Sequence, residues 1–499
     1  MSENSAYNDL VSLYRRIGII NDAIAILDWD QSTIMPEGSA SARSEQLATL
    51  SVLSHDLLTH PKISELLDKV DFNKGKIDSW KVANLEGMKR AHLHAISVPA
   101  DLVKEQSRAN STCQMEWRKA KQENDFAFLM PSLNDVIEVT REVSVAKSEN
   151  LGLSPYDCLL DTYEPGCRSE RIDEIFSNHE KFLSGFLGEV MEFQSKQPKV
   201  VPLKGPFSVD KQKKLGLKFM KDFGFDFSRG RVDVSLHPFC GGGLNDVRIT
   251  TRYDENDFTS SLMGVLHETG HAIYEHGLPE SWSYQPVGSA RGMAMHESQS
   301  LLLEMQVCRS YSFMIYAAPI IKRAFSGSGQ AWEVDNLHRL YTRVSPGFIR
   351  VDADEVTYPA HIILRYRLER ALISNDLLVA DLPAAWNEGM ASLLGITPPN
   401  DSLGCLQDIH WPSGSFGYFP TYTIGAVAAA QFYNAAKKQL NDLEGEISKG
   451  KFQSLLSWLR SNIHSKGSLL SADELLHTAS GDNLNIKIFQ EHLQSRYLN

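Results

Sequence analysis

The chain has 499 residues, of which 42% are hydrophobic and 22% are charged, and its formal net charge is -12. This composition is typical of a folded globular protein of one large domain or roughly two to three ordinary ones, and it excludes disordered and fibrous classes. The negative charge disfavours nucleic-acid binding, which needs a basic patch or stripe. We therefore expect no nucleic-acid partner.

The N-terminal residues and the apolar stretches predict a cytoplasmic protein without a membrane partner. Residues 1–5 are polar and lack the basic and apolar regions of a signal peptide. The most apolar stretches, such as residues 424–432, are far shorter than the ~20 residues of a membrane span. Six scattered cysteines without a CxxC pair are typical of free thiols in a reducing compartment.

Apolar residues at helical spacing dominate the chain from its beginning. The pattern i, i+3, i+4, i+7 occurs in residues 10–17, 47–58, 136–145, 183–193, 362–372 and 455–463. We predict a mainly α fold with a deep active-site groove. Because no clear linker divides the chain, we place a soft boundary near residue 200. Residues 1–200 would form a helical part that walls or caps the groove, and residues 201–499 would carry the catalytic centre.

One segment departs from the helical pattern. Apolar and polar residues alternate over residues 232–236 and again over 247–253, and Gly241–Gly243 lie between them. This alternation predicts a small antiparallel strand pair directly before the next helix. An edge strand there could bind an extended peptide through main-chain hydrogen bonds. The equal alternative is a hairpin that only packs under the helices.

The sequence His267-Glu268-Thr269-Gly270-His271 matches the HExxH pattern of zinc peptidases. Histidines four residues apart on a helix lie about 40° apart around its axis, so both imidazoles can reach one metal ion. Glu268 can then face the open coordination position as general base for the attacking water. Buried apolar spacing supports a helix here, with Thr259 or Ser260 as its cap and Gly277 at its end.

Catalytic zinc commonly takes a third protein ligand, often a glutamate. No histidine follows His271 at the metzincin distance, since position 277 is glycine. A second helix is predicted to begin near Met295, and Glu297 lies in its first turn. Glu297 is therefore the favoured third ligand, and His296 and Glu304 are the alternatives. The pattern predicts one Zn²⁺ per chain.

Further segments resemble the carboxypeptidase Taq family of zinc carboxypeptidases, and the matches follow in order over nearly the whole chain. They are residues 27–30, 35–36, 156–157, 163–166, 237–239, 246–250, 267–271, 296–299, 349–354 and 404–411. The resemblance implies a mostly helical gluzincin-type fold and a broad-specificity carboxypeptidase acting on peptides with a free C-terminus. It implies a homodimer, and it carries the zinc ligands onto His267, His271 and Glu297 and the general base onto Glu268.

A hydrolase of this kind also needs donors for the oxyanion and a group for the substrate carboxylate. Similar helical metallopeptidases place a His and a Tyr near the oxyanion, so His410 and Tyr418 are our candidates. Arginine pairs bidentately with carboxylates, so Arg350 is our first candidate for the C-terminus, with Arg248 and His237 as helpers. We also expect Asp354 and Glu355 to orient Arg350 or a ligand histidine.

Two other functions use the same residues. The scaffold could act as an endopeptidase or a dipeptidyl carboxypeptidase, because only the site that holds the substrate C-terminus differs. A non-catalytic protein stabilised by zinc is the alternative from another class. The intact Glu268 argues against it, since a structural zinc has no use for a general base.

Overall fold

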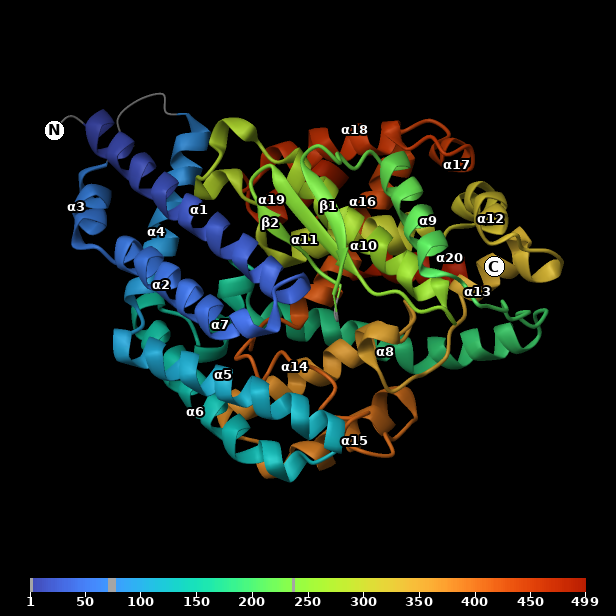
Figure 1. The fold of residues 1–499 in the computed structure, drawn as a ribbon, viewed down its shortest axis with the longest axis horizontal. Coiled ribbons are helices and arrows are strands. Elements are labelled where there is room, and N and C mark those ends of the chain that lie inside the picture. Colours follow the sequence, from blue (N-terminus) through green and yellow to red (C-terminus); the bar gives the residue numbers. More distant parts are fainter. Residues whose placement is uncertain (1–2, 71–77, 236–237) are drawn as a thin grey trace.

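The computed structural model describes residues 3–70, 78–235 and 238–499, and the fold is mainly helical (Figure 1), as predicted. The helices of the first 200 residues are α1 (Glu3–Thr33), α2 (Ala40–Leu58), α3 (Pro61–Lys69), α4 (Ser79–Ile96), α5 (Ala100–Glu123), α6 (Phe126–Leu151), α7 (Pro155–Tyr163) and α8 (Ser169–Ser195).

The remaining residues form a small sheet and further helices. The strands are β1 (Gly230–Val234), β2 (Cys240–Gly243) and β3 (Asp246–Thr251). The helices are α9 (Val209–Asp222), α10 (Phe258–Gly277), α11 (Gly292–Leu301), α12 (Tyr311–Phe325), α13 (Val334–Tyr341), α14 (Tyr358–Ser374), α15 (Leu382–Leu394), α16 (Pro420–Gln439), α17 (Leu443–Ile447), α18 (Gln453–Asn462), α19 (Ala472–Ser480) and α20 (Ile486–Tyr497). A π-helical segment, η4 (Leu302–Cys308), directly continues α11.

The sheet is mixed, with strand order β1-β3-β2, so the predicted antiparallel pairing of the 232 and 247 segments was wrong. Val232 and Ile249 are partners in a parallel pair, and the glycine segment expected as a turn is itself the strand that pairs antiparallel to β3. The reversal occurs just after it, where Asn245 adopts φ 60°. Asn is one of the few residues that tolerate this left-handed conformation in a tight hairpin. Residues 236–237 of the predicted strand lie outside the described residues.

Helix α10 carries the HExxH residues and packs against β3 and α11. Its first turn is capped by Asp257, whose carboxylate accepts a hydrogen bond from the Thr259 amide at 2.8 Å. The predicted caps Thr259 and Ser260 therefore lie inside the helix, and both hydroxyls also donate to Asp257. The helix ends at Gly277, as predicted.

One glycine allows α10 and α11 to approach closely. A Cβ added to Gly270 would lie 2.6 Å from both the carbonyl oxygen of Gln299 and the Cα of Ser300. Such distances are far inside van der Waals contact, so only glycine fits at this crossing. The crossing brings the histidines of α10 next to Glu297 of α11.

One large hydrophobic core joins helices from both parts of the chain, including Trp117 of α5, Phe176 of α8, Leu266 of α10 and Phe432 of α16. A smaller core around Leu10 joins α1, α3 and α4. Helix α1 also lies against β2 (Figure 1). The division near residue 200 stays a prediction. Among the described residues, no helix combines the length and hydropathy that crossing a bilayer requires.

We expect Gly270→Ala to destabilise the protein, because its methyl group would press on backbone atoms that cannot rotate away. Overpacking of this kind costs about 1–3 kcal/mol or more. Gly264→Ala is the matched control on the same helix, since an added Cβ there meets no atom within 4 Å. It should stabilise by up to about 1 kcal/mol through helix propensity. Denaturant unfolding of both variants checks this, and equal effects would contradict the close crossing.

Candidate active site

Three side chains from α10 and α11 point their donor atoms at one position. The donor atoms of His267, His271 and Glu297 all lie within 4.8 Å of one another. The Oε2 atom of Glu297 is 3.8 Å from Nε2 of His267 and 3.5 Å from Nε2 of His271. Ligands at about 2.1 Å from a tetrahedral zinc lie about 3.4 Å apart. The spacing therefore fits a shared ion, and the structure brings the three predicted ligands together.

The surrounding charge also fits a cation. Glu268, Glu297 and Glu304 are all buried near His267. Burial opposes a charge on His267, but the facing carboxylates outweigh burial and raise the pKa of this histidine to about 10. Burial, reinforced by Glu297, raises the pKa of Glu268 to about 7. Its Oε2 is buried and has no hydrogen-bond partner among the described residues. A bound metal ion would offset this buried negative charge.

The two alternative ligands instead support the histidines from behind. Glu304, in η4, contacts Nδ1 of His267 at 3.0 Å, and Arg309 holds the same carboxylate at 2.6 Å. Nδ1 of His296 lies 2.5 Å from Nδ1 of His271. Contacts on the far ring nitrogen fix the orientation of a ligand imidazole. Neither Glu304 nor His296 belongs to the group of three donors.

Arg350 is buried in an ion-pair network rather than exposed in a groove. Its Nε and one terminal nitrogen donate to Oδ1 of Asp408 at 3.0 and 2.9 Å, and Arg365 holds the other oxygen of Asp408 at 2.6 Å. The second terminal nitrogen of Arg350 lies 3.3 Å from the hydroxyl of Tyr358. The guanidinium is thus fixed on one side by Asp408 and contacts the Tyr358 hydroxyl on the other.

His410 and Tyr418 lie together with Tyr422 of α16. Nε2 of His410 is 3.2 Å from the Tyr422 hydroxyl, and the Tyr418 ring lies 5.5 Å from His410 and 5.3 Å from Tyr422. Burial and neighbouring charges lower the pKa of His410 to about 3, so its imidazole is neutral. Burial raises the pKa of Tyr422 to about 12, and that of Tyr418 well above its ordinary value. The three are uncharged groups with protons to donate.

The charge of Glu297, one of the three candidate donors, acts on these tyrosines and on Tyr358. The negative charge of Glu297 adds to burial in raising the pKa of Tyr358, Tyr418 and Tyr422. Helix α16 also packs directly on α11, because a Cβ added to Gly425 would lie 2.8 Å from the Cβ of Glu297. Helix α16, which carries Tyr422, therefore lies directly against Glu297 of α11.

Arg248, one of the predicted helpers, has different surroundings. The guanidinium of Arg248 pairs with Asp246 at 2.6 Å and lies 4.3 Å from the centre of the Trp29 ring. Neither partner belongs to the donor group, so the structure does not bring Arg248 to it. His237 lies outside the described residues.

The expectation that Asp354 and Glu355 orient Arg350 or a ligand was wrong. Asp354 caps the turn before α14, where it accepts from the Val356 and Thr357 amides. Glu355 is buried and pairs with His492 at 2.9 Å and Arg496 at 3.0 Å. The turn before α14 thus occupies Asp354, and α20 occupies Glu355. Sequence spacing alone does not reveal these partners.

Asp408, Tyr358 and Tyr422 were missed by the sequence reasoning. One signal was available for Tyr422, because it follows Tyr418 by only four residues; in the structure Tyr418 precedes α16 and Tyr422 lies in its first turn. Asp408 lies inside a segment that supported the family resemblance, but its role depends on Arg350 and Arg365 from distant segments. Tyr358 carried no local signal.

Comparison with known proteins shows the family of the chain. Residues 9–497 match the family model described as carboxypeptidase Taq (M32) metallopeptidase. The chain belongs to this family. Membership in the carboxypeptidase Taq family makes the chain a peptide hydrolase that works with a metal ion, as predicted.

Relatives match over the whole length. The chain is 36% identical to thermostable carboxypeptidase 1 of Pyrococcus furiosus, covering 99% of both chains. It is 35% identical to thermostable carboxypeptidase 1 of Thermus thermophilus, covering 100% of this chain and 99% of the relative. Among solved structures, metallocarboxypeptidase 1 of Trypanosoma cruzi has a TM-score of 0.96 and 40% identity, covering 99% of this chain and 100% of that one.

We expect Glu304→Gln to weaken metal binding in this carboxypeptidase Taq family member. The amide of the variant can still contact His267. The substitution removes a negative charge from the buried site, and it also removes the ion pair between residue 304 and Arg309. Loss of such a partner typically costs 10–100-fold in metal affinity. Zinc titration of the apo protein against a chromogenic chelator measures it. Glu192→Gln, on an exposed surface pair, is the control; unchanged affinity in both variants would rule out this role of Glu304.

Proposed function

We propose that the chain is a zinc-dependent carboxypeptidase that hydrolyses the C-terminal bond of peptides with broad specificity, with one Zn²⁺ per chain. The observation that carries this proposal is the buried group of His267, His271 and Glu297 with the unpartnered carboxylate of Glu268 beside it. Two imidazoles and one carboxylate are donors that suit zinc, and three ligands leave one position open.

Glu268 serves as the general base. When bound, zinc supplies Lewis-acid activation of the attacking water and polarises the scissile carbonyl. The carboxylate of Glu268 accepts the proton of that water and passes it to the leaving amine. Its burial on α10, with one oxygen free of other partners, keeps that oxygen available for the transfer.

His410 and Tyr418 donate to the oxyanion that develops on the scissile carbonyl. Both are neutral groups, because burial lowers the pKa of His410 and raises that of Tyr418, to which Glu297 also contributes. Preorganised neutral donors stabilise such a charge without reorganisation during the reaction. The contact of Tyr422 with Nε2 of His410 orients the imidazole.

Arg350 recognises the free carboxylate of the substrate. Asp408 fixes the guanidinium plane, and a preorganised arginine loses little freedom when it pairs with a carboxylate. Arg248 and His237 stay predicted helpers, and the contacts of Arg248 with Asp246 and Trp29 favour Arg350 as the main anchor.

The substrates, the location and the oligomeric state are proposed together with the activity. We propose peptides with a free C-terminus as substrates, a cytoplasmic location and a homodimer. The dimer rests on the family resemblance, and the location rests on the scattered free cysteines. Endopeptidase or dipeptidyl carboxypeptidase action is the second candidate, because the same metal site serves all three.

Glu268→Gln should abolish hydrolysis, since the amide cannot accept the proton. Loss of a general base costs on the order of 10²–10⁴ in kcat. Zinc binding should persist, because Glu268 is not one of the three donors. Removing zinc from the wild-type protein with a chelator should also stop hydrolysis, and adding zinc should restore it. Full activity in Glu268→Gln would refute the mechanism.

Arg350→Lys should raise KM and lower kcat/KM about 100-fold for peptides with a free C-terminus, because lysine loses the bidentate fork. Arg248→Lys is the matched comparison and should change kcat/KM less. Mass spectrometry of a mixed peptide pool should show single residues leaving from the C-terminus, and amidated peptides should stay intact. Cleavage inside doubly blocked peptides would instead support the endopeptidase.

A further inference from the structure

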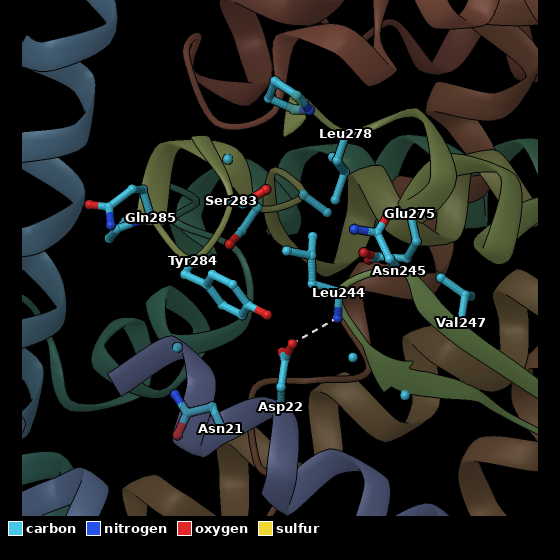
Figure 2. A pocket seen from close by; sticks show the side chains of 18 of the residues that line it. Asn21, Asp22, Leu244, Asn245, Val247, Glu275, Leu278, Ser283, Tyr284 and Gln285 are labelled. Carbon is cyan, nitrogen blue, oxygen red and sulfur yellow. Dashed lines mark hydrogen bonds between the residues drawn. The ribbon is translucent and has the colours of Figure 1, made fainter. Parts of the chain in front are cut away.

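A cavity of about 490 Å³ lies between α1, β2, the end of α10 and the segment 278–290 (Figure 2). Its volume is within the roughly 300–1,000 Å³ of ligand sites. Ile17, Leu278 and Tyr284 supply apolar wall. None of the three zinc donors lines the cavity, but His296, which contacts the ligand His271, does.

Two carboxylates from different elements line this cavity. Asp22 projects from α1 and accepts the Leu244 amide through Oδ2 at 2.8 Å (Figure 2). Glu275, on α10, contacts His296 at 2.7 Å. Burial raises the pKa of Asp22, and the charge of Glu275 raises it further, so the two carboxylates interact across the cavity.

The lining offers little positive charge to balance them. Arg229 lines the cavity, but its guanidinium already pairs with Asp226 at 2.9 Å and with Glu280 at 3.4 Å. Among the described residues, no lysine or arginine pairs with Asp22 or Glu275. The cavity therefore favours a positively charged occupant.

Strand β2 connects this cavity with the catalytic groups. It is an edge strand, since the order of the sheet is β1-β3-β2. At its beginning, Cys240 packs against the core cluster that contains Val265 and Ala272 of α10, the residues that flank the HExxH segment. Burial, and then the charge of Glu268, raises the pKa of Cys240. At its end, Gly243 lies against Asp22, because an added Cβ would be 2.9 Å from that carboxylate. A peptide extended along this edge would lead from the reacting bond towards the cavity.

The length of β2 sets how many substrate residues separate the scissile bond from Asp22. Four residues of strand span about 13 Å at roughly 3.3 Å per residue. A peptide in the same extended conformation therefore reaches Asp22 with a residue about three to five positions before the scissile bond. Lysine and arginine side chains combine an apolar stem with a charged end, which suits a cavity that has both kinds of wall.

We propose that this cavity binds a positively charged group of the peptide substrate, upstream of the scissile bond, between Asp22 and Glu275. The inference rests on the proposed carboxypeptidase function and adds a determinant of substrate choice to it. The group is an ammonium or guanidinium, supplied either by a lysine or arginine side chain or by the free N-terminus of a short peptide.

The test compares peptides that share one C-terminal residue and differ at a single upstream position. Lysine is placed at each of the third to fifth positions before the scissile bond, with norleucine as the uncharged match, in N-acetylated peptides. Free and acetylated peptides of matching lengths form the second arm. At one position, we expect at least a 10-fold higher kcat/KM for lysine, or for the free N-terminus if that is the source.

The Asp22→Asn variant tests whether the cavity causes the preference for a positively charged upstream group. The amide keeps an acceptor for the Leu244 amide and removes the charge, so the preference should fall to about 2-fold or less. Asp210→Asn, on exposed α9 surface, should keep the wild-type preference. Equal rates for charged and uncharged peptides, or a preference that survives in Asp22→Asn, would overturn the proposal. Failure to cleave even the norleucine peptides would instead reject the proposed carboxypeptidase function.

Discussion

The close crossing of α10 and α11 at Gly270 is the constraint on which the site depends. A side chain there would separate the two backbones and move Glu297 away from the histidines. Glycine is therefore required inside the HExxH segment for packing, in addition to the histidines required for chemistry. Helix α16 also approaches α11 closely through a glycine, because Gly425 lies against Glu297. Three helices thus pack closely around Glu297, the candidate third donor.

Buried charge is the second consequence of this packing. Three glutamates gather around His267 in a region with little solvent, and each has a distinct partner or task. Glu304, in the π-helical segment, is held by Arg309, whereas Glu268 keeps an oxygen without a partner among the described residues. The same arrangement recurs at Arg350, which Asp408 immobilises. Charged groups that do not react fix the positions of those proposed to react.

Much of the site was predictable from the sequence, because the metal donors follow local helical spacing. His267, His271 and Glu297 come from two neighbouring helices, and the family resemblance covered the chain. The residues that were missed lie where distant segments meet: Asp408 with Arg350 is the clearest case. The sheet was mispaired because strand direction depended on where the chain turns, after the glycine segment rather than within it. Alternation of apolar residues does not contain that information.

The packing of the last helix has a consequence for the enzyme itself. Arg496 donates to the carbonyl of Gln306 in η4 and pairs with Glu355, and Tyr497 is only 3% exposed. Helix α20 is thus tied to the same segment that carries Glu304, which contacts His267. Loosening α20 would therefore release the support behind His267, so the stability of this helix and the order of the candidate metal site are coupled.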